Sequence, residues 1–304
     1  MVEWDEELDT KVKEHEKKTE KPKPEVGKVE AKTSAVFTED DIKGLLDGAL
    51  KRQLSEHEVA GFNCLILGAD GTGKSGIVLS YLAKKPKKSV IIDLDRGVEP
   101  VYEAYHRGND KLIIVPVLEM TRTEDDIILD YRKTLVKLKG IIKYVAKHHD
   151  EFSGICIDGI SSLLKNAEYI MRIDKHIAPD GGVSMRYWIQ RNKIFTEILE
   201  AVKNIKNIDR FYIGHEDFVM KEDAAAVKAK TNQMIHQRIM CKKVEDKNVV
   251  KFVAKIDKCK YNLSLEGTEY TFGTVNKETK ETTWRATQVF KGLRGEGSAV
   301  PEKK

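Results

Sequence analysis

Residues 68–75 read Gly-Ala-Asp-Gly-Thr-Gly-Lys-Ser, which matches the phosphate-binding pattern G-x-x-x-x-G-K-[ST] in full. The apolar run 62–67 before it is typical of a buried strand, and residues 76–83 after it are typical of the first turns of a helix. In that context glycines let the backbone curl until several N–H groups point at one phosphate, and the helix N-terminus adds partial positive charge. The alternative is a glycine-rich turn that ends in Lys-Ser by chance, and both flanks argue against it.

This loop predicts a nucleotide site with defined roles. Lys74 is expected to reach the β- and γ-phosphates, and the Ser75 hydroxyl is expected to bind Mg²⁺. The residues expected to hold the nucleotide, ATP, are Gly68, Ala69, Asp70, Gly71, Thr72, Gly73, Lys74, Ser75 and Gly76.

Composition limits the class of protein. Of 304 residues, 34% are charged and 40% hydrophobic, and no apolar run approaches the roughly 18 residues that span a bilayer. The N-terminus lacks a signal-peptide core, and the four cysteines show no C-x-x-C spacing. We therefore expect a reduced cytoplasmic protein (in the host cytoplasm if it is viral) without a membrane partner, disulfide framework or zinc site. The net charge of +4 permits a polyanionic partner without arguing for one.

Four segments are expected along the chain. Residues 1–37 are rich in lysine and glutamate and are predicted to form a disordered tail. Residues 38–60 begin with a candidate N-cap, Thr38, and continue with helical spacing. The ATPase core is predicted over 61–291, and a flexible tail over 292–304.

Within the core, short apolar runs alternate with helical patterns. Such runs predict a mostly parallel central sheet with helices on both faces, which is the α/β arrangement of P-loop proteins. The expected strands after the first are 90–95, 112–117, 154–158 and 211–214, and the expected helices are 123–148 and 184–205. Later the spacing shortens, and strands at 235–244, 249–256 and 270–272 predict an antiparallel C-terminal extension.

Asp158 ends the apolar strand 154–158 about 85 residues after the phosphate loop. A carboxylate there can hold Mg²⁺ through water opposite Ser75, so Asp158 is the predicted second metal residue. The alternative is an ordinary aspartate at a strand end that caps the next helix.

Asp95 ends the second strand, which we expect to lie beside the phosphate loop, and it is the predicted base that activates the attacking water. Without a catalytic role, Asp95 would pair with Arg96 or Lys84, or cap a helix. The alternative bases are Asp93, Glu99 and Glu216. His215 follows the fifth strand, where a polar side chain can contact the γ-phosphate and report its loss; the alternative is a structural histidine.

In order and spacing, five segments between about residue 60 and 273 resemble the RecA family. They are 88–108, 155–163, 181–186, 211–215 and 253–260. The resemblance implies a RecA-like P-loop ATPase, close in kind to the reduced RecA-core recombinases and single-strand annealing ATPases of phages and archaeal viruses, or to RadA paralogues. Two residues depart from the family pattern, because Asp95 stands for glutamate and His215 for glutamine. No phenylalanine-alanine polymerisation motif is evident.

The resemblance also implies single-stranded DNA and a second copy of the chain as partners. Residues 173–186 and 217–233 would face DNA, and the candidate contacts are Lys175, Arg186, Phe218, Lys221, Lys228 and Lys230. Lys258 and Lys260 match the late strand whose lysines reach a neighbouring subunit's nucleotide. The alternatives are two solvated loops, and lysines that simply face water.

The leading hypothesis is an ATP- and Mg²⁺-dependent protein of DNA recombination, repair or strand annealing that acts as an oligomer on single-stranded DNA. Three alternatives use the same nucleotide site. They are a KaiC-like regulatory ATPase that acts on protein, a DNA helicase or packaging motor, and a binding module in which ATP is structural only.

Overall fold

The computed structural model describes residues 38, 40, 42–44, 46, 47, 61–122, 127–216, 231 and 233–293. The chain divides into two compact units, Met1–His57 and Glu58–Lys304. In the first unit the described residues from 40 to 47 are helical. All the described residues from 61 onward belong to the second unit.

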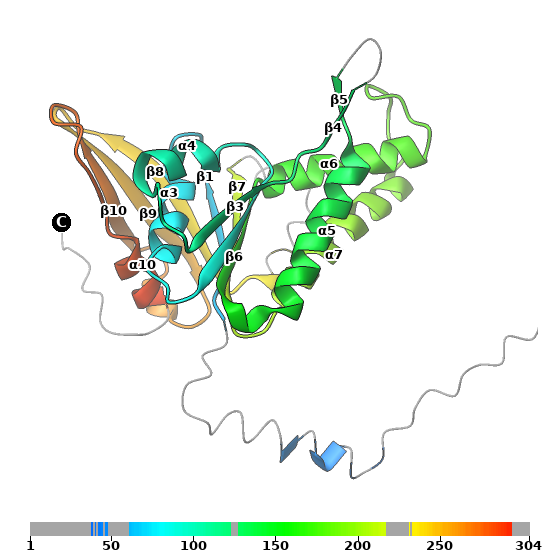
Figure 1. Cartoon of the computed structure of the whole chain (residues 1–304), viewed down its shortest axis with the longest axis horizontal. Coiled ribbons are helices and arrows are strands. Elements are labelled where there is room, and N and C mark those ends of the chain that lie inside the picture. Colours follow the sequence, from blue (N-terminus) through cyan, green and yellow to red (C-terminus); the bar gives the residue numbers. More distant parts are fainter. Residues whose placement is uncertain are drawn as a thin grey trace, which may run out of the picture. The chain divides into compact units, whose positions relative to one another are not determined.

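A nine-stranded sheet forms the centre of the second unit, in the order β11-β10-β9-β8-β1-β7-β6-β2-β3 (Figure 1). The six strands from β8 to β3 in that order pair in parallel, whereas β9, β10 and β11 pair antiparallel. The strands of this sheet are β1 Asn63–Gly68, β2 Lys88–Asp93, β3 Leu112–Pro116, β6 Phe152–Asp158, β7 Asp209–His215, β8 Gln237–Glu245, β9 Val249–Cys259, β10 Glu269–Asn276 and β11 Thr282–Trp284. The predicted fold class is confirmed, including the antiparallel extension.

Helices cover both faces of the sheet, as continuous apolar strands require. The helices α3 Lys74–Leu82, α4 Val98–Tyr105 and α10 Ala286–Leu293 contribute to one core, which includes Ile77, Leu79 and Phe290. The helices α5 Tyr131–Lys147, α6 Ile160–Asp174 and α7 Trp188–Lys203 contribute to the other core. Figure 1 shows these two groups of helices on opposite sides of the strands.

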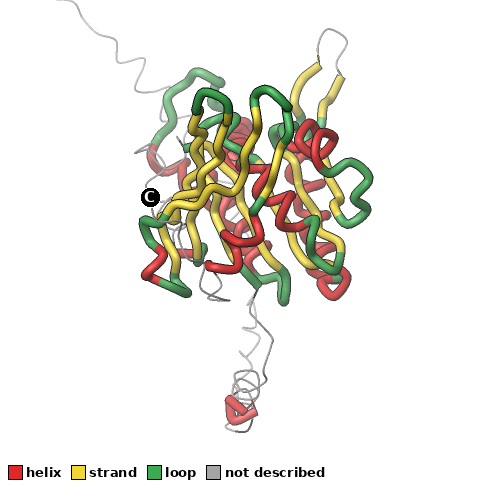
Figure 2. Tube along the Cα trace, turned by 90° about the vertical axis from the view of Figure 1, so that its left-hand side faces the viewer, coloured by secondary structure: helices red, strands yellow, loops and turns green. Residues whose placement is uncertain are grey.

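The prediction of one helix over 123–148 is wrong in its first part. Helix α5 begins at Tyr131, where Asp130 caps it by accepting a hydrogen bond from the Lys133 backbone N–H at 2.9 Å. The strands β4 Met120–Arg122 and β5 Ile127–Leu129 form a separate antiparallel hairpin, which projects beside the main sheet in Figure 2. Isoleucine and leucine at 127–129 suit either structure, and pairing with β4 decides between them.

The expectation that β2 lies beside the phosphate-loop strand is also wrong. The neighbours of β1 are β7 and β8, so β7 and β6 separate β1 from β2. Because all these strands are parallel, their carboxyl ends still meet at one edge of the sheet. The predicted site residues Asp95, Asp158 and His215 lie at that edge.

Candidate nucleotide-binding site

The phosphate loop joins the end of β1 to the start of α3. Gly73, the residue before α3, has φ 81°, a left-handed conformation that glycine adopts without steric cost. Thr72 braces the turn, because its hydroxyl donates to the Ala69 carbonyl at 2.8 Å. The Lys74 ammonium donates to the carbonyls of Gly68 and Ala69, at 3.0 and 2.8 Å. These contacts place the lysine charge directly over the loop.

A cavity of about 530 Å³ opens at this loop, which is a size typical of small-molecule sites. It brings together the phosphate loop with three predicted residues from other strand ends, Asp95, Asp158 and His215. The remaining lining residues are Gly97, Val101, Tyr105, Ile213, Gly214, Phe252 and Trp284.

Asp158 lies at the end of β6, where it is almost fully buried. Its Oδ2 accepts a hydrogen bond from the Ser75 hydroxyl at 2.5 Å. Burial, together with the neighbouring carboxylates Asp93 and Asp95, raises the pKa of Asp158 to about 7, although Ser75 and Lys74 oppose the shift. A nearby cation would therefore strongly stabilise the ionised form of this carboxyl group.

The raised pKa predicts that replacing Asp158 by asparagine changes the pH dependence of stability. Without nucleotide and Mg²⁺, the folded protein keeps a proton on Asp158 that the unfolded chain releases near pH 4, so this group's contribution to stability falls between about pH 4 and 7. Asparagine does not titrate in this range, so the stability of Asp158→Asn does not show this decrease with pH. Its free energy of unfolding relative to the wild type is expected to rise by about 3 kcal/mol from pH 5 to pH 8. Urea denaturation at both pH values measures this, and an unchanged difference would contradict it.

Asp95 reaches the cavity although β2 is remote from β1, because the segment after β2 turns toward the loop. Asp93 holds this turn, since its carboxylate accepts from the backbone N–H groups of Asp95 at 3.1 Å and of Val98 at 3.2 Å. Asp93 is buried and committed to these two bonds. Asp93 and Glu99 line a separate cavity, and Glu216 lines neither of the two cavities. Of the four candidate bases, only Asp95 therefore faces the phosphate loop.

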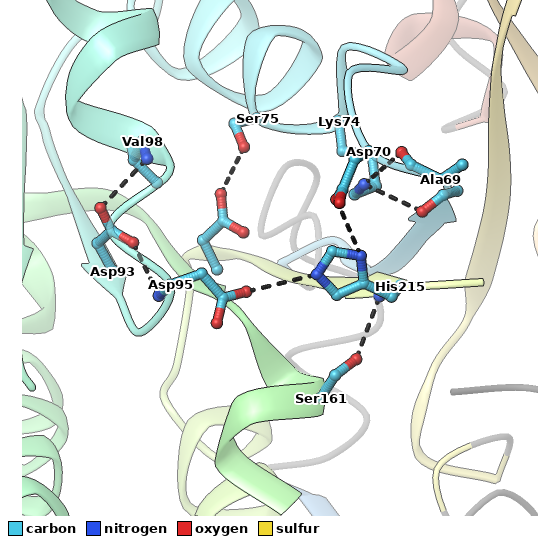
Figure 3. A network of polar contacts seen from close by, with 11 residues as sticks. Ala69, Asp70, Lys74, Ser75, Asp93, Asp95, Val98, Ser161 and His215 are labelled. Carbon is cyan, nitrogen blue, oxygen red and sulfur yellow. Dashed lines mark hydrogen bonds and ion pairs between the residues drawn. The ribbon is translucent and has the colours of Figure 1, made fainter. Parts of the chain in front are cut away.

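His215 bridges the loop and the candidate base. Figure 3 shows the His215 ring between Asp70 and Asp95. Its Nδ1 lies 3.2 Å from Asp70 Oδ1, and its Nε2 lies 3.8 Å from Asp95 Oδ2. The His215 backbone N–H donates to the Ser161 hydroxyl at 3.1 Å, which fixes the end of β7 against α6. A side chain in this position can transmit a change at the phosphate loop to Asp95.

An aromatic wall at one end of the cavity was not predicted from the sequence. The Trp284 ring stacks on Phe252 with centroids 5.5 Å apart and planes at 16°, and Tyr105 meets Trp284 edge-on at 5.6 Å. The Trp284 indole N–H is buried and has no hydrogen-bond partner within the described part of the chain. These π-faces and the indole donor suit a nucleobase. The strands that carry Phe252 and Trp284 follow the loop by more than 170 residues. The one signal in the sequence that could have drawn attention to Trp284 is that tryptophan is rare in this chain.

The other predicted contacts lie away from this cavity. Lys175 and Arg186 flank Tyr187, with Lys175 Nζ 5.6 Å and Arg186 Cζ 4.8 Å from the ring centroid. Four predicted DNA contacts lie outside the described residues, namely Phe218, Lys221, Lys228 and Lys230.

Lys258 and Lys260 lie at the opposite end of the sheet from their own phosphate loop, because Cys259 pairs with Gln237, which pairs with Cys64 near the start of β1. They belong to a basic cluster formed by Lys203, Arg210, His236, Lys258 and Lys260. Burial lowers the pKa of His236, and the four other members of the cluster lower it further. Burial, followed by Lys260 and Arg238, also lowers the pKa of Lys258.

Within the described residues, no group of three or more histidine, cysteine or acidic side chains is arranged to hold a metal ion by itself. The four cysteines are buried and form no disulfide bond with one another. No helix in the described ranges combines the length and apolar character needed to cross a membrane.

The phosphate loop, the order of the parallel strands around it and the carboxylates at their ends define a RecA-like P-loop fold. No family model and no curated protein matches the chain. Among solved structures, a RadB recombinase is 14% identical, with a TM-score of 0.42 over 75% of this chain and 92% of that one. A KaiC-like protein from Pyrococcus horikoshii is 14% identical, with a TM-score of 0.40 over 70% and 85%. The flagellar accessory protein FlaH from Methanocaldococcus jannaschii is 16% identical, with a TM-score of 0.40 over 75% and 90%. The roles of these proteins do not transfer to this chain at such identities.

Proposed function

We propose that this chain binds and hydrolyses ATP with Mg²⁺ and works as an oligomer on single-stranded DNA, in recombination or strand annealing. The observation that carries the proposal is the convergence of Lys74, the Ser75–Asp158 pair and Asp95 on one cavity of nucleotide size. Phosphoryl transfer requires mainly positioning and charge stabilisation, and these residues supply both.

The residues present fit a magnesium ion. Ser75 and Asp158 offer hard oxygen donors, and a buried carboxyl whose pKa is raised by desolvation is a favourable place for a cation. Two protein donors suffice, because Mg²⁺ keeps several waters and binds substrate phosphates. When bound, the ion would neutralise charge on the phosphate oxygens.

The side chains then divide the work. The Lys74 ammonium, which now contacts loop carbonyls, would bind the β- and γ-phosphates. Asp95 would accept the proton of the attacking water. The shorter aspartate, in place of the glutamate that the RecA resemblance leads one to expect, requires that water to lie closer to the strand end. His215 would link the occupancy of the loop to the position of Asp95.

Two surfaces support the proposed partners. The cations around Tyr187 can contact phosphates while the ring stacks on a base. The basic cluster with Lys258 and Lys260 lies too far from its own loop to act there, so a nucleotide that it contacts would belong to a second copy.

The deciding experiment measures ATP turnover with and without single-stranded DNA over a range of protein concentrations. We expect turnover per chain to rise several-fold with DNA and to rise with protein concentration, and Lys260→Ala to remove the concentration dependence. If ATP turnover is the same with and without DNA, and no salt-sensitive oligonucleotide binding is found, a regulatory ATPase that acts on protein is the better description. Unchanged turnover of Lys258→Ala and Lys260→Ala would rule out the inter-subunit role.

A further inference from the structure

Helix α5 carries an unusual concentration of positive charge. Its 17 residues include six cations and no acidic side chain, whereas the net charge of the whole chain is +4. The buried side of the helix is formed by Thr134, Leu138, Ile142 and Val145, so the cations lie on the remaining surface. Those six cations are Arg132, Lys133, Lys137, Lys139, Lys143 and Lys147.

Acidic neighbours pair with the cations in the first part of the helix only. Arg132 pairs with Asp174, Lys133 with Asp130 and Lys137 with Glu119. Lys139 has a longer contact to Glu197 at 3.8 Å. Lys143 and Lys147 form no ion pair within the residues that the structure describes, and Glu151, which follows the helix, pairs with His148 instead. The second part of α5 therefore presents two exposed lysines that no ion pair neutralises.

Two parallel rows run along the exposed surface of α5, which also carries Arg132, Lys133 and Ala146. Lys139, Lys143 and Lys147 follow one another at intervals of four residues, which is about 6 Å along the helix. The second row, also at intervals of four, is formed by Val136, Gly140 and Tyr144, and it ends at the half-buried His148 just after the helix. A cationic row thus runs beside an apolar and aromatic row.

The second row has the features of a binding surface. Val136 is 71% exposed and Tyr144 55% exposed, and the Tyr144 ring stacks on His148 at 4.5 Å. A Cβ added to Gly140 would meet nothing within 4 Å, so no contact of the described residues requires glycine there. Glycine inside a helix costs about 1 kcal/mol relative to alanine. A ligand that approaches the helix backbone closely at this point would explain the residue.

We infer that this face of α5 binds single-stranded nucleic acid, with the backbone phosphates on Lys143 and Lys147 and a base on Tyr144. A row of cations suits the repeating charge of a phosphodiester chain. The exposed ring next to it favours nucleic acid over an acidic protein segment, because any base can stack on it. An anionic membrane is a poorer match, since the apolar side of α5 is already buried in the core.

This site extends the proposed DNA binding rather than repeating it. Arg132 and Asp174 join the start of α5 to the end of α6, next to Lys175, while Lys147 lies about 22 Å further along the helix. Single-stranded DNA bound near Tyr187 would extend along this surface, and α5 would then contact several more of its nucleotides. The inference therefore rests on the proposed function for its ligand, but on different residues.

The test measures the affinity of the full chain for a fluorescent oligothymidylate, with a non-hydrolysable ATP analogue, over a series of salt concentrations. Lys143→Gln combined with Lys147→Gln is expected to weaken binding about tenfold and to reduce the slope of log affinity against log salt by about 1.4. Tyr144→Ala and Gly140→Gln are expected to weaken binding about tenfold with the slope unchanged. The matched control, Lys277→Gln combined with Lys280→Gln at the β10–β11 turn, removes the same charge and should bind like the wild type.

Three results would overturn the inference. If the wild type binds DNA and the α5 variants match the control, the α5 site is wrong and the proposed function stands. If the wild type binds no oligonucleotide in any nucleotide state, both fail. If the α5 lysines instead mediate binding to phosphatidylserine vesicles or polyglutamate and not to DNA, the ligand class is wrong. Turnover without DNA should be unchanged in every α5 variant, which shows that the nucleotide site is intact.

Discussion

Lys74→Ala is expected to lower the ATP turnover number at least about 100-fold. Lys74 is the cation placed over the phosphate loop, where it donates to the Gly68 and Ala69 carbonyls. Its removal deletes a charge-assisted contact to the phosphates that strengthens as charge develops in the transition state. The loop's backbone donors remain, so ATP binding should weaken about 10- to 100-fold and not vanish.

Steady-state hydrolysis and calorimetric titration with ATP and Mg²⁺ measure the two effects. Lys84→Ala is the matched control, because Lys84 is an exposed lysine just beyond α3 and lines neither cavity. Equal thermal stability of both variants would show that the fold is intact. If Lys74→Ala hydrolyses ATP at the normal rate, the nucleotide site has been assigned to the wrong part of the molecule.

Asp95→Asn is expected to lower turnover about 10²- to 10⁴-fold while ATP affinity changes little. Asparagine keeps the shape of the side chain but cannot accept the proton of the attacking water at neutral pH. Glu99→Gln is the matched control, because Glu99 also follows β2 but lines the separate cavity and not the one at the phosphate loop. Its turnover should be close to that of the wild type.

Single-turnover measurements separate the chemical step from product release. Normal turnover in Asp95→Asn together with a large loss in Glu99→Gln would reverse the assignment of the base. Normal turnover in both would point to a different residue. Asp93→Asn is not a fair test of the base, since Asp93 holds the backbone of this segment through its bonds to Asp95 and Val98.

The sequence predicted the local structure well where one interaction dominates. The pattern at 68–75 requires a strand before it and a helix after it, and β1 and α3 have that arrangement. The continuous apolar runs predicted a sheet covered on both faces, and the short spacing after 235 predicted the antiparallel strands β8 to β10. The pattern failed at 127–129, where three aliphatic residues suit a helix or a strand and pairing with β4 determines the outcome.

In the candidate site, too, some features followed from the sequence and others from packing between distant segments. The second strand was expected beside the phosphate loop, but β7 and β6 lie between β1 and β2. Asp95 nevertheless faces the loop, because Asp93 folds the following segment back over the strand ends. Phe252 and Trp284 were not predicted, since their place at the cavity depends on how the antiparallel extension packs against Gly73 and Gly76 at the start of α3.

The sequence by itself determined the phosphate loop, the class of fold and the carboxylates that end the strands, because each depends on neighbouring residues and on a repeating pattern along the chain. Only the tertiary structure decided which carboxylate faces the loop, which aromatic rings close the cavity, and which lysines of α5 pair with acidic side chains. Those relations depend on strand order and on which charges find partners. Both result from packing between segments far apart in the chain, which no local pattern records.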